Sequence, residues 1–131
     1  MREILFRGKR TDGTGWIEGF YFQKPNPTSE DGRPVYHGIT DLPPFCAEVI
    51  PETVGQYTGL KDQNGKRIFE GDIVHGDNYW HKNLRTYQVA FEDGCFFLVD
   101  SSGRLWHKDH IENCEVIGNI HDNPEMLEVE G

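Results

Sequence analysis

Histidine is the residue type in this sequence that most directly suggests metal or catalytic chemistry. The histidines are His37, His75, His81, His107, His110 and His121. His107 and His110 are three residues apart, so on a helix they would share a face and could bind zinc with a third ligand. The segment around them lacks a clear helical pattern, and no cysteine lies close to it in the sequence. His75 and His81 form a second loose pair. We expect water-exposed loop histidines, with no metal site and no cofactor.

Paired carboxylates are the next candidates for chemistry. Glu70 lies close to Asp72, and Glu92 lies next to Asp93, each pair beside a glycine. A catalytic acid–base pair needs a pocket and two different environments, whereas acids beside glycine usually shape turns. The sequence contains neither a nucleophile-elbow motif nor a phosphate-binding glycine loop. These observations predict that the protein is not an enzyme.

An aromatic and basic segment in the second half of the chain is the best sequence candidate for binding. Its residues are Tyr79, Trp80, Lys82, Arg85 and Tyr87. Exposed rings next to cations can stack on nucleic-acid bases or hold a peptide. In the alternative interpretation, Trp80 folds back to cover one end of a barrel, because exposed tryptophan is uncommon without a partner.

The charge of the chain limits its partners. Its formal net charge is −9, which repels phosphate backbones and disfavours nucleic-acid binding over the whole surface. One basic cluster, Arg2, Arg7, Lys9 and Arg10, lies near the start. It is interpreted either as a solvated strand edge or as a local nucleic-acid contact, and the first interpretation fits the net charge better.

The cysteines and the hydropathy pattern indicate a compartment. Cys46, Cys95 and Cys114 are odd in number and widely spaced, which favours reduced thiols. No apolar stretch has the length of a signal peptide or a membrane span. We therefore expect a protein that stays in the cytoplasm of the cell that makes it.

Short strand patterns separated by turns dominate the chain. Residues 4–6 and 16–22 flank a turn at 11–15, which predicts a β-hairpin. Gly19 inside the second run suggests a bulge or a close backbone approach. Further strands are expected at 35–39, 46–50, 86–91, 95–99 and 114–120, a loop or long hairpin tip at 75–85, and a short helix after Asn123 and Pro124.

The order of elements predicts a mainly β fold. From Ile68 onward it matches a small SH3-like barrel, in which Gly71 permits a turn, Asp72 accepts hydrogen bonds from nearby backbone N–H groups and Ile73 points inward. We expect an N-terminal β-hairpin or small β-subdomain packed with this C-terminal barrel, and at most short helical turns. The expected boundaries are 1–56 for the first part, 57–120 for the barrel and 121–131 for a short acidic helix or tail.

Three segments of the chain resemble one family. The start, REILFRGKR at 2–10 followed by WIEG at 16–19, the central block TVGQYTGLKDQNGKRIFEGDIV at 53–74 and the end VIGNIHDNPE at 116–125 are similar to YopX-type proteins. The resemblance covers nearly the whole chain. It implies a phage or prophage origin in bacteria, chiefly Gram-positive ones, and it supplies no catalytic residues.

Three functional hypotheses follow. The first is a non-enzymatic module that binds a host or phage protein or another copy of itself. The second is a nucleic-acid-associated accessory protein that uses the basic cluster or the segment 79–85. The third is a metal-dependent enzyme built on histidines, for which the sequence offers no complete set of ligands.

Overall fold

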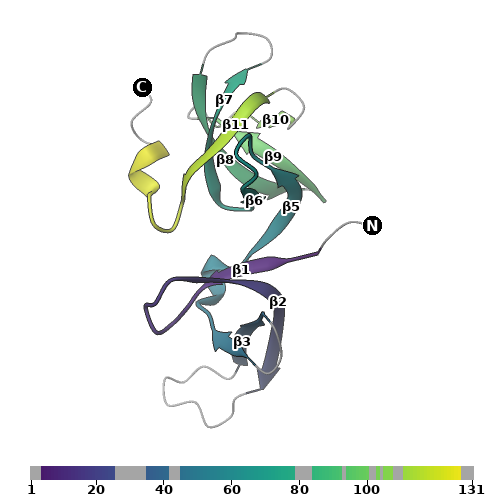
Figure 1. Ribbon diagram of the computed structural model, residues 1–131, viewed down its shortest axis with the longest axis vertical. Coiled ribbons are helices and arrows are strands. Elements are labelled where there is room, and N and C mark those ends of the chain that lie inside the picture. The colour runs from purple at the N-terminus through teal and green to yellow at the C-terminus, as the bar shows by residue number, and fades with distance from the viewer. Residues whose placement is uncertain are drawn as a thin grey trace. The chain divides into compact units, whose positions relative to one another are not determined.

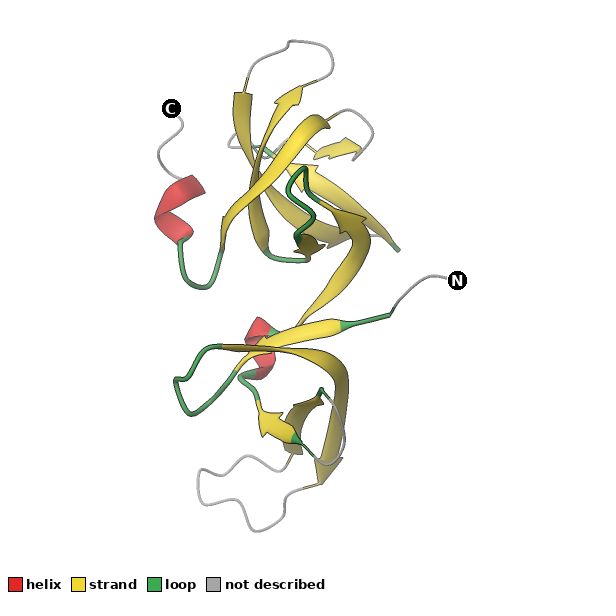
Figure 2. Cartoon of the chain, viewed as in Figure 1, coloured by secondary structure: helices red, strands yellow, loops and turns green. Residues whose placement is uncertain are grey.

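The structure is a computed structural model that describes residues 4–25, 35–41, 45–78, 84–92, 94–100, 103, 105–107 and 111–127. Antiparallel strands dominate these residues, and their helices are two short 3-10 turns (Figure 2). The prediction of a mainly β fold is therefore confirmed. No helix in the described part of the chain is long and apolar enough to cross a membrane.

The chain divides into two compact units, residues 1–57 and 58–131. This boundary lies one residue after the one expected from the sequence, and the second unit includes the residues after 120. Each unit has a hydrophobic cluster of its own. Strand β5 begins in the first unit and continues into the second (Figure 1).

The first unit is built on a meander of antiparallel strands. Its elements are β1 (Phe6–Lys9), β2 (Trp16–Pro25), β3 (Val35–Thr40), β4 (Cys46–Glu48), the 3-10 turn η1 (Pro51–Thr53) and the start of β5 (Gly55–Lys61). The strand order β4-β3-β2-β1-β5-β6 places each of the first four strands beside its neighbour in the sequence. The predicted hairpin of β1 and β2 is thus the centre of a larger sheet.

Backbone hydrogen bonds also join the end of β1 to the chain that follows β4. The Thr11 N–H donates to the Glu48 carbonyl at 3.1 Å, and the Ile50 N–H donates to the Lys9 carbonyl at 2.9 Å. Arg10 and Val49 form an antiparallel bridge between these two bonds. The first unit therefore closes on itself, and these groups at the edge of β4 are already paired.

Alternate residues of the first unit form its core. The buried cluster is Ile17, Ile39, Ala47 and Val49, and Phe6, Tyr21 and Val54 pack against it. Gly19 lies among these positions because β2 and β3 approach too closely for a side chain. A Cβ atom on Gly19 would lie 2.2 Å from the carbonyl oxygen of Thr40. The predicted close backbone approach at Gly19 is confirmed.

The second unit contains a five-stranded antiparallel sheet in the order β10-β9-β8-β7-β11. Its elements are β6 (Arg67–Phe69), β7 (Asp72–Asn78), β8 (Leu84–Glu92), β9 (Cys95–Val99), β10 (Leu105–His107), β11 (Ile111–Asn119) and the 3-10 turn η3 (Pro124–Leu127). Its core cluster is Ile68, Val74, Tyr87, Val89 and Leu98. The likeness to an SH3 barrel remains a prediction.

The Glu70–Asp72 turn starts the long hairpin of β7 and β8. The Asp72 carboxylate is buried and accepts a hydrogen bond from the Phe69 N–H at 2.8 Å. Gly71 has a φ of 91°, a left-handed conformation that favours glycine. Ile73 is fully buried. The roles predicted for these residues are confirmed, and this acidic pair is part of the turn.

The Asp62 carboxylate ties the turn between β5 and β6 to strand β11. Its Oδ1 accepts hydrogen bonds from the backbone N–H groups of Asn64 and Lys66, both at 2.9 Å. Its Oδ2 accepts one from the Val116 N–H, also at 2.9 Å. Burial of Asp62 disfavours the ionised form, but these donors outweigh that effect and lower the pKa of the carboxyl. Asp62 is therefore held as an anion by backbone dipoles.

Replacing Asp62 by Asn should destabilise the protein by about 2–3 kcal/mol, because an amide cannot accept all three hydrogen bonds. The lowered pKa stabilises the wild type above the unfolded-state pKa of about 3.9, and this contribution disappears as pH falls through the folded-state value. Urea unfolding from neutral pH to acid should show the difference between D62N and wild type shrinking below about pH 4. E115Q is the matched control, since Glu115 is exposed; equal midpoints for D62N and wild type at neutral pH would contradict the prediction.

Gly19→Ala should destabilise the first unit by about 2 kcal/mol or more, because the added Cβ meets backbone atoms that cannot rotate away. Gly13→Asn is the control, because Gly13 has a φ of 79° in an open turn, and Asn tolerates that conformation. Thermal unfolding monitored by circular dichroism compares the two variants. The prediction is wrong if G19A is no less stable than G13N.

Candidate functional site: an aromatic sheet face

Of the five binding residues predicted from the sequence, the structure describes Arg85 and Tyr87. Tyr79, Trp80 and Lys82 lie outside the described residues. Arg85 is in β8, where it pairs with Gly76. Tyr87 has no exposed surface and belongs to the core of the second unit, so its assignment as a binding residue was wrong. The physical reason is the register of β8, which turns Tyr87 inward with Val89.

The segment 75–85 was expected to be either a loop or a long hairpin tip, and part of it is strand. Strand β7 continues to Asn78 and β8 begins at Leu84, with Asp77 paired to Leu84. The interpretation as a long hairpin tip is therefore the better one. Only residues 79–83 lie between the two strands.

The N-terminal basic cluster is not an open cationic surface where the structure describes it. Arg2 lies outside the described residues. Arg7 is only 8% exposed, and its guanidinium carbon lies 4.9 Å from the centre of the Trp16 ring. Arg10 forms an ion pair with Asp12 at 2.9 Å. Neither sequence interpretation, a solvated edge or a phosphate-binding patch, describes the buried Arg7.

Neither histidine pair singled out in the sequence is fully described by the structure. Among the residues that the structure describes, no three His, Cys, Asp or Glu side chains are grouped so that they could hold a metal ion. His81 and His110 lie outside these residues. His75 is in β7, where it pairs with Thr86.

A different surface gathers aromatic side chains, on strands β2, β3 and β4 of the first unit. Directly paired residues of antiparallel strands point to the same side of a sheet. The register therefore sets one side apart from the core. We call this side the outer face; its residues are Phe20, Phe22 and Lys24 of β2, Tyr36, Gly38 and Thr40 of β3, and Cys46 and Glu48 of β4.

Two rings cover the middle of the outer face. The rings of Phe22 and Tyr36 stack with their centres 6.0 Å apart and an interplanar angle of 27°. They cover Gly38, where a Cβ atom would lie 2.6 Å from the tip of Phe22 and 2.8 Å from the Tyr36 ring. The Lys24 ammonium lies 4.9 Å from the centre of the Tyr36 ring, a cation–π distance. The absence of a side chain at Gly38 thus makes room for both rings.

Phe20 of the outer face and Phe45, which precedes β4, are largely open to water. Phe20 is 60% exposed and Phe45 is 49% exposed. The Thr40 hydroxyl donates a hydrogen bond to the Phe45 carbonyl at 2.7 Å, which fixes the backbone at this end. The Arg10 guanidinium carbon lies 5.6 Å from the centre of the Phe45 ring. Large exposed rings on a flat sheet are a feature of interaction surfaces.

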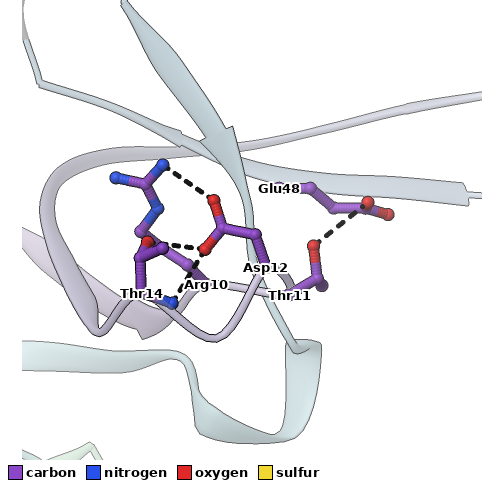
Figure 3. Close-up of polar contacts among 5 residues, drawn as sticks. All are labelled: Arg10, Thr11, Asp12, Thr14 and Glu48. Atoms are coloured by element: carbon purple, nitrogen blue, oxygen red, sulfur yellow. Dashed lines mark hydrogen bonds and ion pairs between the residues drawn. The ribbon is translucent and has the colours of Figure 1, made fainter.

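A polar network borders the outer face at the turn between β1 and β2 (Figure 3). The Thr11 hydroxyl donates to Glu48 at 3.3 Å, so the turn reaches the side chain of β4. Asp12 accepts hydrogen bonds from the hydroxyl and the N–H of Thr14, at 2.6 and 2.9 Å. These Thr14 bonds, assisted by Arg10, lower the pKa of Asp12. The network holds the charged groups of the turn in fixed positions.

The opposite side of the same strands supports the outer face from the core. Tyr21 and His37 stack in nearly parallel planes, and the Tyr21 hydroxyl is 2.6 Å from Nδ1 of His37. The Phe6 ring is 5.8 Å from the Tyr21 ring. Aromatic residues therefore lie on both sides of β2 and β3, which stiffens this part of the sheet.

Burial raises the pKa of one tyrosine on the outer face and of one cysteine beside the core of the second unit. Burial, and then the neighbouring Cys46 and Glu48, raise the pKa of the Tyr36 phenol. It therefore stays protonated at neutral pH and can donate a hydrogen bond. Burial raises the pKa of the Cys114 thiol to about 11, which makes it unreactive.

The fold and this surface define a small antiparallel β protein of two units, the first of which displays an aromatic sheet face. The family model of the YopX protein matches residues 5–128, so the chain belongs to the YopX family. The resemblance found in the sequence is thus confirmed.

Two solved structures share the fold. Protein EF1440 from Enterococcus faecalis is 26% identical, with a TM-score of 0.56, over 97% of this chain and 99% of that one. Protein yopX from Bacillus subtilis is 18% identical, with a TM-score of 0.56, over 100% of this chain and 98% of that one. A search of curated proteins found no match.

Gly38→Ala should disturb the ring pair while leaving the unit folded, because the tips of flexible side chains can move aside. We expect a stability loss of about 1 kcal/mol or less, smaller than that of G19A. The chemical shifts of the Tyr36 ring protons should change, since the Phe22 ring moves away. NMR spectra and urea unfolding of the same sample measure both quantities. Unchanged Tyr36 ring shifts would contradict the arrangement over Gly38.

Proposed function

We propose that this protein is a non-enzymatic protein-binding module and that the outer face is its binding surface. The observation that carries the proposal is the exposure of Phe20 beside the stacked pair of Phe22 and Tyr36. Aromatic side chains supply most of the binding energy in protein interfaces because they bury a large area with few rotatable bonds. In keeping with the phage or prophage origin that the resemblance implies, we place the protein in the cytoplasm of a host bacterium.

The closure of the first unit supports binding through the face of the sheet. A partner that adds a strand needs unpaired N–H and C=O groups at an edge. The edge of β4 pairs with the end of β1 through Glu48 and Ile50. These bonds leave fewer unpaired backbone groups at this edge, which favours binding through side chains.

The charges support a protein partner over a nucleic acid. The chain carries a net charge of −9, and the charged residues of the outer face are Lys24 and Glu48, which balance each other. Arg7 is buried and Arg10 is paired with Asp12. A surface of this kind offers rings with a single balanced cation, whereas phosphate contacts require several.

A double variant, Phe20→Ser with Phe22→Ser, tests the proposal. Wild type, double variant and a Phe91→Ser control are immobilised and exposed to lysate of bacteria carrying an induced prophage, with quantitative mass spectrometry of retained proteins. Phe91 is 43% exposed but lies in the second unit, so it controls for nonspecific apolar adsorption. We expect wild type and F91S to retain a common lysate protein, and the double variant to retain at least about tenfold less of it. The reason is that truncating a central aromatic residue of an interface commonly costs about 2 kcal/mol of binding free energy.

Two results would contradict the proposal. One is equal retention by all three proteins together with a wild type that stays monomeric at millimolar concentration, with circular dichroism confirming that all three are folded. The other is binding of a duplex oligonucleotide at low salt by wild type and double variant alike, which would favour the nucleic-acid hypothesis.

A further inference from the structure

We infer that the partner of the outer face is a second copy of this chain, packed face to face around a twofold axis. The inference rests on the proposed function, because it requires the outer face to bind protein. It goes further by naming the partner and the residues that meet.

The register sets the layout of the outer face. Lys24 of β2 pairs with Tyr36 of β3 at one end. In the next row Phe22 pairs with Gly38, and Gly38 pairs with Glu48 of β4. The cation therefore lies on one outer strand and the anion on the other. The stacked rings of Phe22 and Tyr36 lie between them.

This layout is self-complementary. In a twofold interface one patch meets the same patch of the second copy, so residue i contacts residue j while j contacts i. Consider a twofold axis that lies in the plane of the interface and crosses the line from Lys24 to Glu48 at its midpoint and at a right angle. Rotation about this axis places Lys24 of each copy opposite Glu48 of the other. The same axis passes over the ring pair, so Phe22 and Tyr36 meet their own counterparts. Two ion pairs then flank a central aromatic contact.

The charge of the whole chain favours this face for self-association. Two chains of net charge −9 repel each other, and contact is least unfavourable where the facing charges cancel. Lys24 and Glu48 cancel within the outer face. Charges elsewhere are screened beyond about 8 Å at physiological salt. The balanced outer face is thus a surface on which two such chains can approach.

Both charged groups are held before binding. The Lys24 ammonium lies over the Tyr36 ring at 4.9 Å, and Glu48 accepts the Thr11 hydroxyl at 3.3 Å. Side chains that are already positioned lose less conformational entropy when an interface forms. This arrangement strengthens the ion pairs that the twofold axis creates.

Charge reversal and its rescue test the inference. Lys24→Glu alone, Glu48→Lys alone and the double exchange K24E/E48K are compared with wild type by sedimentation velocity over a concentration series. Each single reversal converts both attractive contacts into repulsive ones, so we expect dimer dissociation constants at least about tenfold higher. The double exchange restores opposite charges and should return the constant to within a few-fold of wild type. Glu52→Lys, at an exposed position outside the outer face, is the control for net charge.

Cysteine alkylation gives a second measurement that does not alter the outer face. Cys46 and Cys95 are both exposed free thiols, but only Cys46 belongs to the outer face. Dimerisation should slow the reaction of Cys46 with iodoacetamide as protein concentration rises, while the rate at Cys95 stays constant. Equal concentration dependence at the two sites would overturn the inference.

The outcomes separate this inference from the proposed function. A wild-type protein that stays monomeric at millimolar concentration overturns the inference, as does a dimer insensitive to both single reversals. If the F20S/F22S variant still loses a retained lysate protein, the proposed function stands and the partner is a different protein. If retention is also unchanged, both fail.

Discussion

The hydrogen bonds from three backbone N–H groups to the Asp62 carboxylate are the constraint on which the second unit depends. They connect a turn at residues 62–66 with Val116, which is 54 positions away in the sequence. Burying a carboxylate is unfavourable unless donors surround it, so this anion is stable only when turn and strand are both in place. The Gln63 N–H adds a bond to the Cys114 carbonyl beside it. The block with the strongest family resemblance is therefore the segment that fixes the long-range contact of the unit.

The first unit is stabilised by a different set of backbone contacts. Its meander closes because the end of β1 pairs with the chain after β4 through Lys9, Arg10 and Thr11. Thr53 reinforces the closure, since its hydroxyl accepts the Lys9 N–H at 2.9 Å and donates to the Ile50 carbonyl at 2.6 Å. Closure satisfies backbone groups that would otherwise attract a foreign strand. This closure is consistent with the proposed function, in which the side chains on the face of the sheet bind the partner.

Local chemistry explains which features the sequence predicts. The turn glycines, the buried Asp72 and the close approach at Gly19 follow from backbone sterics and short-range hydrogen bonds, which neighbouring residues determine. The burial of Arg7 and Tyr87 and the outer face depend on register between distant strands. A shift of one residue would exchange the two sides of each strand. Because Phe20, Tyr21 and Phe22 are consecutive aromatic residues, their pattern alone cannot show which ring faces the core.

Under the proposed function, the same two strands serve stability and recognition on opposite sides. On the inner side Tyr21 and His37 stack against the core, while on the outer side Phe22 and Tyr36 stack over Gly38. The inner rings anchor β2 and β3 rigidly, so the outer rings are presented on a backbone with little freedom to rearrange. Rings held in this way lose little entropy on binding, whereas rings on a mobile loop must first be ordered. A sheet face supported from behind by its own core is for this reason a better recognition surface than the loop that the composition of the chain first suggests.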